Sequence, residues 1–110
     1  MPTEWEWQAV ADFNGSFTYG CGTSINISIA NYHDSVHPNG TTVVGAFGSY
    51  GYGMCDMAGN VYEWTSTDWE GFRVIRGGSW FGYDSDCTVL FQYPDYPTLV
   101  SSGLGFRVCR

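Results

Sequence analysis

The sequence predicts one small α+β domain with one or two helices, several short strands and much irregular loop. The chain has 110 residues, which is the size of a single domain. Its 15 glycines and its aromatic content of 18% favour turns and short strands over a helix bundle. Hydrophobic residues make up 44% of the chain and charged residues 14%, a balance that excludes a disordered chain. We therefore expect one folded domain over residues 1–110.

The first segment is the strongest helix candidate. Thr3 can cap the N-terminus of a helix, because its hydroxyl can accept a hydrogen bond from a backbone amide of the first turn. Trp7, Val10 and Ala11 then fall on one helical face. Gly15 predicts the end of the helix, since glycine readily adopts positive φ.

The rest of the chain predicts loops and short strands. Glycines recur from residue 15 to residue 53, which is typical of turns. Short runs of β-branched or aromatic residues predict strands at Thr41–Val44, Val61–Thr65, Arg73–Gly77 and Gly105–Arg110. The tryptophans are expected mainly in the core, at Trp5, Trp7, Trp64, Trp69 and Trp80.

The charge balance excludes several classes of partner. Eleven acids face four basic residues, for a formal net charge of −7, and the chain has no lysine. Nucleic acid is therefore not expected as a partner, because binding to phosphates needs a basic face. Membrane insertion is not expected either, because no apolar run approaches the roughly 20 residues of a span. The N-terminus lacks the basic and apolar regions of a signal peptide.

Cysteine and histidine spacing does not predict a transition-metal site. The cysteines lie far apart, without a CxxC pair, at Cys21, Cys55, Cys87 and Cys109. Two disulfides of any of three connectivities remain open, and buried free thiols are the simpler expectation. The cluster of His33, Asp34 and His37 lacks a further anchored ligand, so we expect a solvated loop there.

Two arginines are expected inside the protein, at Arg76 and Arg107. A buried guanidinium needs a carboxylate or backbone carbonyls to offset its lost hydration. The candidate partners are Glu4, Glu6 and Glu63.

Four stretches together carry a family resemblance: Pro2–Trp7 (PTEWEW), Gly51–Trp64 (GYGMCDMAGNVYEW), Arg73–Trp80 (RVIRGGSW) and Leu104–Val108 (LGFRV). In this order they resemble the formylglycine-generating-enzyme (sulfatase-modifying factor) superfamily, whose pattern runs LPTEAEWE, GLYDMAGNVWEW, RGGSW and GFR. The resemblance implies a C-type-lectin-like fold with a small twisted antiparallel sheet. Domains of that family usually carry a further N-terminal portion, including a first helix. This chain begins at the first motif, so we expect a fragment, a minimal version of the fold, or a fold completed by another chain.

The resemblance also bears on catalysis. Catalytic members bind copper through two cysteines that match Gly82 and Cys87 here, so one ligand is missing. The two arginines that follow in the family pattern are replaced by Thr88 and Gln92. We therefore expect no copper and no oxidase activity. A degenerate or partial oxidase domain is the alternative.

A second branch of the superfamily fits better, namely the variable proteins of diversity-generating retroelements. They keep RGGSW and GFR fixed and diversify the stretch between them, which is 81–102 here. That stretch is rich in Tyr, Ser, Gly and Asp, the composition of antibody paratopes. We therefore predict a non-catalytic display domain on a virion or cell surface that binds a protein or cell-surface ligand. An ordinary drifting loop, in a structural module of a larger surface protein, is the competing interpretation.

The predicted ligand-binding residues are Phe81, Tyr83, Asp84, Ser85, Asp86, Thr88, Phe91, Tyr93, Tyr96, Thr98 and Ser101. We expect most of Tyr83, Asp84, Asp86, Tyr93 and Tyr96 to be exposed on one face, with Trp80 and Phe106 buried. An acidic rim of Asp84, Asp86 and Asp95 would favour a partner with a basic edge, and added salt should slow the association.

The resemblance finally suggests a structural Ca²⁺ at Asp56, Gly59, Val61 and Glu63. Two carboxylates and two backbone carbonyls are hard oxygen ligands, which suit calcium. The competing interpretation is that Asp56 and Glu63 accept hydrogen bonds from backbone amides or from Arg76. Both interpretations stay open at the level of the sequence.

Overall fold

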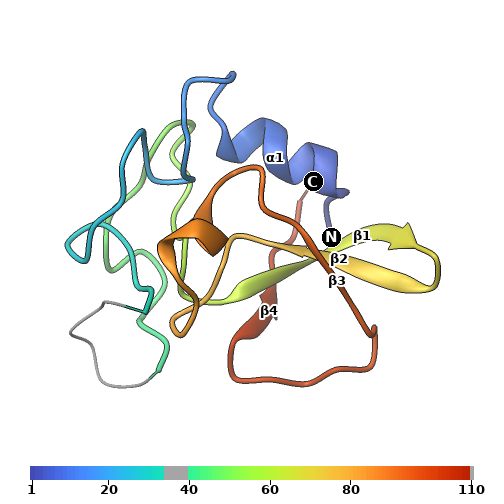
Figure 1. Ribbon diagram of the computed structural model, residues 1–110. Helices are drawn as coiled ribbons and strands as arrows, with labels where there is room; N and C mark the ends of the chain where they lie inside the picture. Colours follow the sequence, from blue (N-terminus) through green and yellow to red (C-terminus); the bar gives the residue numbers. More distant parts are fainter. Residues whose placement is uncertain (34–39, 110) are drawn as a thin grey trace.

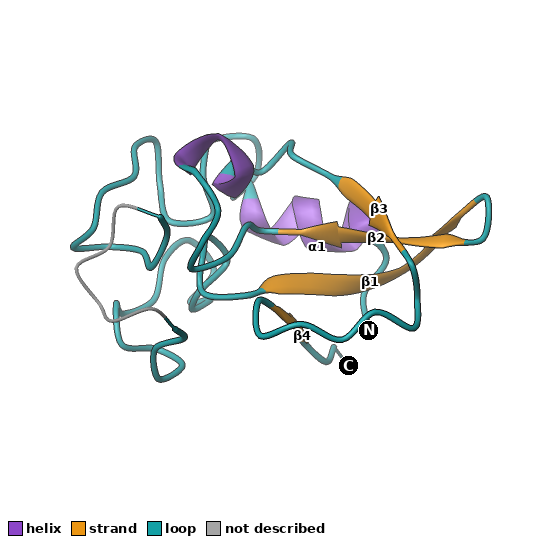
Figure 2. Ribbon diagram, turned by 60° about the horizontal axis from the view of Figure 1, so that its bottom comes forward, coloured by secondary structure: helices purple, strands orange, loops and turns teal. Residues whose placement is uncertain are grey.

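The computed structural model describes residues 1–33 and 40–109, so Asp34 and His37 of the histidine cluster lie outside the described residues. The elements follow in the order α1 (Glu4–Ala11), β1 (Tyr62–Trp69), β2 (Phe72–Arg76), the 3₁₀-helix η1 (Asp84–Cys87), β3 (Tyr93–Asp95) and β4 (Leu104–Phe106). Helix α1 packs against the sheet, and an extended loop region fills the other end of the molecule (Figures 1 and 2). No helix in the described ranges is long and apolar enough to cross a bilayer.

Helix α1 begins where the sequence predicts. The Thr3 hydroxyl accepts a hydrogen bond from the Glu6 amide at 3.1 Å, and the Thr3 amide donates to Glu6 Oε1 at 2.8 Å. This reciprocal capping satisfies two backbone donors of the first turn and commits Glu6 to the cap. The helix ends at Ala11, earlier than predicted, and Gly15 has the expected positive φ of 78°.

The strands form a four-stranded sheet in the order β3-β2-β1-β4. β1, β2 and β3 pair antiparallel, whereas β4 pairs parallel to β1, with Tyr62 opposite Leu104. The expectation of a purely antiparallel sheet is therefore corrected to a mixed one. The physical reason is the long connection 96–103, which crosses from one sheet edge to the other and returns the chain in the direction of β1.

Two strand predictions hold and two need correction. The predicted strands at Val61–Thr65 and Arg73–Gly77 correspond to β1 and β2, and the C-terminal strand is shortened to Leu104–Phe106. The strand predicted at Thr41–Val44 is wrong. There the Thr42 amide donates to the Asn60 side chain at 2.9 Å instead of joining a ladder, and both valines of the run are exposed. β3 and η1 were not predicted.

The loop region is held by the DMAGN motif at residues 56–60. The Asn60 amide donates to the Asn31 carbonyl at 2.8 Å, and the Asn60 carbonyl accepts from the Trp80 amide at 2.8 Å. Gly59 has φ +76°, and a Cβ there would lie 2.3 Å from the Asn31 carbonyl oxygen. Only glycine allows this close approach, so the motif joins the loops to the end of β2.

The tryptophan prediction holds in part. Trp7 is 1% exposed and packs with Ala11, Met57 and Val89, whereas Trp5 and Trp69 are 65% and 54% exposed. Trp64 and Trp80 are half-buried. The core prediction is therefore wrong for Trp5 and Trp69, because both line a surface cavity between the start of α1 and the strands.

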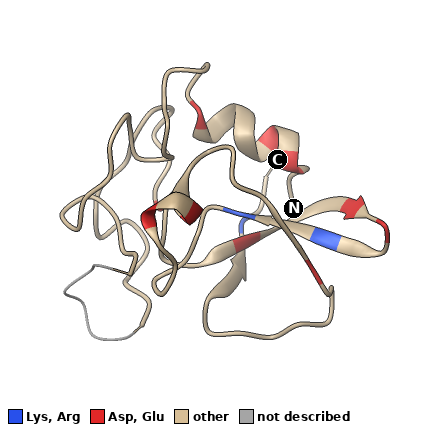
Figure 3. Cartoon of the chain, viewed as in Figure 1, with Lys and Arg blue, Asp and Glu red and all other residues tan. Residues whose placement is uncertain are grey.

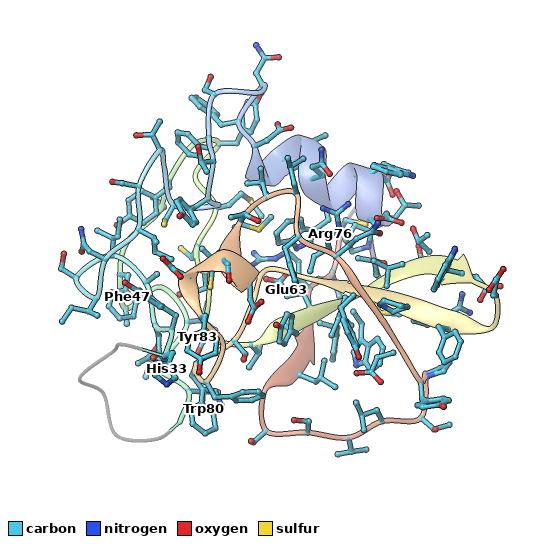
Figure 4. All side chains as sticks on the ribbon, in the orientation of Figure 1. His33, Phe47, Glu63, Arg76, Trp80 and Tyr83 are labelled. Carbon is cyan, nitrogen blue, oxygen red and sulfur yellow. The ribbon has the colours of Figure 1, made fainter. Side chains whose placement is uncertain are left out.

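The arginine prediction is confirmed for the pairing with carboxylates and for the burial of Arg76, whereas Arg107 is only half-buried. Arg76 Nη2 donates to Glu4 Oε1 at 2.8 Å, and Arg76 Nη1 donates to the Val89 carbonyl at 2.7 Å. Arg107 binds both carboxylate oxygens of Glu63, with Nε–Oε1 at 2.6 Å and Nη2–Oε2 at 3.0 Å. Arg76 and Glu63 lie between α1 and the sheet (Figure 4). Arg76 thus links the N-terminal motif to β2, and Glu63 links the C-terminal motif to β1.

Candidate ligand-binding groove

The segment after Trp80 forms a groove on one face of the sheet. The groove has a volume of about 350 Å³. Tyr62 of β1 and Ile75 of β2 contribute to its lining from the sheet. The other lining residues all belong to the C-terminal segment: Phe81, Asp86, Phe91, Tyr93, Asp95, Leu99, Ser101, Gly103 and Leu104. Figure 1 shows this segment leaving the sheet after β3 and returning along its lower side to β4.

Five of the predicted ligand-binding residues meet in this groove: Phe81, Asp86, Phe91, Tyr93 and Ser101. Phe81 and Tyr93 are exposed, and Tyr93 is held by the pairing of β3 with Ile75. Gly103 allows the close approach of the Phe81 ring, since a Cβ there would lie 2.2 Å from that ring. The groove therefore presents aromatic surface on a fixed backbone.

The other predicted residues lie outside the groove. Tyr83 is exposed and the centroid of its ring lies 4.6 Å from that of His33. Figure 4 shows the two side chains near each other. Asp84 and Ser85 are exposed on η1, and Thr88 donates to the Ser85 carbonyl at 3.3 Å. Tyr96 is exposed with its ring 5.1 Å from Phe72, and Thr98 is exposed in the loop after β3. The segment thus offers a groove and flanking exposed side chains.

The exposure predictions hold for the tyrosines and fail for two flanking residues. Tyr83, Asp84, Tyr93 and Tyr96 are exposed and Asp86 is half-buried. Trp80 is only half-buried, and Phe106 is 68% exposed, so the prediction that both are buried is wrong. Phe106 lies on the edge strand β4, where it lines a different cavity with Val44 and Val108. Leu104 of the same strand lines the groove.

Asp86 sets the electrostatics of the groove. Its Oδ2 accepts a hydrogen bond from the Tyr83 amide at 3.1 Å, which fixes the carboxylate at the start of η1. Burial, and then the neighbouring Asp86 carboxylate, raise the pKa of the Tyr62 hydroxyl well above its usual range. Tyr62 therefore stays neutral, and Asp86 and Asp95 give the groove its negative charge. Acidic positions are spread over α1, η1 and the β1–β2 turn, without a basic cluster among the described residues (Figure 3).

The positions that match the family's copper ligands lie behind this groove. Cys87 is fully buried, and burial, followed by the charge of Asp86, raises the pKa of its thiol to about 12. Its Sγ donates to the Tyr83 carbonyl at 3.6 Å. Gly82 is buried, and a Cβ there would lie 3.2 Å from Asp86 Oδ2. The prediction that neighbouring carboxylates disfavour the thiolate is confirmed, although burial is the larger cause.

The four cysteines are free thiols, and all of them lie in the described ranges. Cys21 and Cys87 pack in one cluster with Ala30, Tyr32 and Ala58. Burial raises the pKa of Cys21 to about 11. No group of three or more His, Cys, Asp or Glu side chains within residues 1–33 and 40–109 is arranged to hold a metal ion.

The two carboxylates predicted for calcium already accept hydrogen bonds from the protein. Both carboxylate oxygens of Glu63 accept bonds from Arg107, and Oε1 also accepts from Trp7 Nε1 at 3.0 Å. Asp56 Oδ2 accepts from the Gly45 amide at 2.8 Å. Asp56, Val61 and Glu63 line one cavity of about 390 Å³, whereas Gly59 is not part of its lining. Arg107 offsets the charge of Glu63, whereas Asp56 accepts from a backbone amide, so calcium binding at this position stays a prediction.

Sequence reasoning missed several groove residues. Tyr62 and Ile75 come from strands outside the predicted segment, Leu99 lies inside it but was not singled out, and Asp95 was predicted for the acidic rim only. Strand alternation offered one signal, since Tyr62 and Trp64 flank the buried Glu63 and must face away from it.

The fold and motifs define a domain of the formylglycine-generating type. The family model for the sulfatase-modifying factor enzyme 1-like domain matches residues 1–110, so the chain belongs to that family. The predicted resemblance is confirmed.

Relatives of known name share this domain within longer proteins. Serine/threonine-protein kinase pkn1 of Chlamydia caviae is 34% identical over 133 residues, across 100% of this chain and 21% of that protein. The formylglycine-generating enzyme of Mycobacterium tuberculosis is 35% identical over 80 residues, across 62% of this chain and 27% of that protein. Inactive C-alpha-formylglycine-generating enzyme 2 of Bos taurus is 29% identical across 97% of this chain and 42% of that protein. The chain thus spans less than half of each.

Solved structures confirm the fold. Treponema denticola variable protein 1 matches with a TM-score of 0.80 and 29% identity, over 96% of this chain and 45% of that one. PvdO from Pseudomonas aeruginosa matches with a TM-score of 0.81 and 23% identity, over 96% of this chain and 50% of that one, and shows the fold alone. The C-type-lectin-like α+β fold predicted from the motifs is therefore correct.

Proposed function

We propose that this domain is a non-catalytic binding module that recognises a protein or cell-surface ligand through the groove between β3 and β4. One observation carries the proposal. The segment 81–103 between the two fixed motifs supplies eight of the eleven residues that line the groove, while the motifs supply the other three and hold the sheet and loops in place. Variation in this segment would change the ligand without disturbing the fold.

The chemistry of the groove suits recognition. Ile75 and Leu104 offer an apolar lining, and Phe81 and Tyr93 offer exposed aromatic rings. Such rings bury much area at little entropic cost, as in antibody paratopes. Asp86 and Asp95 add negative charge at the groove. A ligand with an apolar side chain beside a basic edge would complement this surface, and added salt would slow its association.

The positions matched to copper ligands support a role other than oxidation. Gly82 has no ligand atom, and Cys87 is buried with a thiol pKa raised to about 12. A lone protonated thiol is a poor ligand for a soft metal and a poor nucleophile. The alternative, a degenerate or partial oxidase domain, would need a second sulfur donor from elsewhere.

The likeness to Treponema denticola variable protein 1 supports the type of binding module. We infer that this chain is a variable protein of the diversity-generating retroelement type, displayed on a virion or cell surface. A reverse-transcriptase gene and a near-identical template repeat beside the coding gene are the expected observation. A gene neighbourhood without either would contradict the retroelement assignment and would favour a structural module of a larger surface protein.

Binding is tested with the fluorescently labelled chain on an array of purified surface proteins. A protein bound by the wild type should lose affinity about tenfold or more with Tyr93→Ala, in line with truncation of a central aromatic contact. Tyr52→Ala is the matched control, because Tyr52 is equally exposed but lies in the loop region, against Phe13. An equal loss of affinity in both variants, or no loss of affinity with Tyr93→Ala, would show that the groove does not bind the ligand.

Catalysis is tested separately by oxygen consumption with Cu(I) and a cysteine-containing peptide. We expect no consumption above the rate of copper alone. Consumption that Cys87→Ala abolishes would establish the oxidase alternative.

A further inference from the structure

A second cavity lies on the opposite face of the sheet from the groove. Val74 lines this cavity while its neighbour Ile75 lines the groove, and successive residues of a strand point to opposite faces. The cavity has a volume of about 360 Å³ and lies between the start of α1 and the strands β1 to β3. Trp5 of α1 and Trp69 of β1 line it and are both more than half exposed.

The exposure of Trp5 is not explained by packing. In the family pattern, PTEAEW, an alanine stands where this chain has Trp5, so the fold does not require an indole there. Its neighbour on α1, Trp7, fills the core position of the same motif. Two large exposed apolar side chains beside one cavity are typical of a binding surface.

The polar groups of the cavity are uncharged or neutralised. Glu4 is 5% exposed, and its carboxylate is paired with the guanidinium of Arg76 at 2.8 Å. The Thr67 hydroxyl accepts from the Glu4 amide at 2.9 Å, which leaves its own hydrogen available to donate. Gln92 is exposed and carries an amide that both donates and accepts. Arg76 thus removes the net charge that would attract a cation or an anion.

We infer that this cavity binds a neutral glycan. The C–H groups on one face of a pyranose ring are slightly positive and complement the negative face of an indole. Its hydroxyl groups match the hydroxyl of Thr67 and the amide of Gln92. Arg76 also lies over the Trp5 ring, 5.8 Å from its centroid, and this contact helps to orient the indole. The site needs no metal ion and is separate from the groove.

The experiment is a titration of the ¹⁵N-labelled chain with cellohexaose, maltohexaose, chitohexaose and mannohexaose, each to about 10 mM. The five tryptophans report through their indole N–H signals, assigned by single substitution. We expect at least one of these oligosaccharides to shift the Trp5 and Trp69 signals saturably. Trp69→Ala should weaken that binding about tenfold or more.

Two further variants and a folding check accompany the titration. Trp5→Ala should also weaken binding, and circular dichroism and thermal unfolding should show that both variants fold. Tyr93→Ala should leave glycan binding unchanged, which separates this site from the proposed protein-binding groove. Absence of a saturable shift with all four sugars would overturn the inference. So would an unchanged shift in Trp69→Ala, or a dimer in sedimentation velocity that Trp5→Ala dissociates.

Discussion

Removal of the carboxylate that neutralises Arg76 should strongly destabilise the protein. The Arg76 side chain is 1% exposed and that of Glu4 is 7% exposed, so both charges are largely shielded from water. Arg76 Nε already lacks a hydrogen-bond partner, which leaves the guanidinium dependent on Glu4 and the Val89 carbonyl. Breaking a buried pair from one side costs about 3–5 kcal/mol, because the remaining charge stays buried. The free energy of unfolding of a domain is only about 5–15 kcal/mol.

We therefore expect Glu4→Gln to lower the free energy of unfolding by about 3–5 kcal/mol. The measurement is urea denaturation followed by tryptophan fluorescence, with the m-value checked for constancy. The double variant Glu4→Leu/Arg76→Met should recover most of the loss, since apolar replacement of a whole buried pair is often neutral. This recovery would show that the isolated charge, and not the altered side-chain shape, causes the effect.

The chain provides a matched control in Asp68 and Arg73. Their charged atoms lie 3.9 Å apart, with side chains 62% and 40% exposed. An exposed pair contributes less than about 1 kcal/mol, so Asp68→Asn should change stability little. If Glu4→Gln costs no more than Asp68→Asn, then water reaches Arg76 and the reasoning on the buried pair is refuted.

Four further predictions follow from the packing and the thiols. Gly59→Ala should lower the free energy of unfolding by about 2 kcal/mol more than Gly53→Ala. Both glycines have positive φ, but only at Gly59 would an added Cβ lie 2.3 Å from a backbone atom, the Asn31 carbonyl oxygen. Equal Tm values for the two variants would refute the clash. Ellman's reagent at about pH 8 should modify the exposed Cys109 quickly and the buried Cys21 and Cys87 only after unfolding, and fast modification of Cys87 would contradict its burial. The free energy of unfolding should fall as pH rises above 9.0, since the folded state keeps the Cys87 proton up to a pKa of about 12 while the unfolded state releases it, and Cys87→Ala should reduce that slope in urea titrations across this range. Millimolar Ca²⁺ should leave Tm unchanged relative to EGTA because Arg107 occupies Glu63, and a rise in Tm that Asp56→Asn abolishes would instead establish a calcium site.

The sequence was most informative where local chemistry decides the structure. The capping of α1 by Thr3 depends on residues three positions apart, and so could be read directly. The partners of Arg76 and Arg107 were limited to a few carboxylates, because a buried guanidinium requires one. The segment 81–102 stood out by its composition, and three of its aromatic side chains, Phe81, Phe91 and Tyr93, line the groove.

Features that depend on distant contacts were not predictable. Val43 and Val44 have strand-like composition, but the Asn60 side chain takes the hydrogen bond that a neighbouring strand would have supplied. β3 has only three residues and exists because it pairs with β2. Phe106 follows a β-like pattern, yet its position on an edge strand leaves it exposed. In each case the partner, and not the local sequence, decides the outcome.

The placement of β3 and β4 at the two outer edges of the sheet has a consequence for evolution. The connection 96–103 must cross the width of the sheet, and its two ends are fixed by hydrogen bonds to different strands. Because closing a loop costs only about 0.6 kcal/mol more when its length doubles, insertions between these anchors would be tolerated. A lineage carrying this domain could therefore change the length of the connection, and with it the depth of the groove, while inheriting the same sheet.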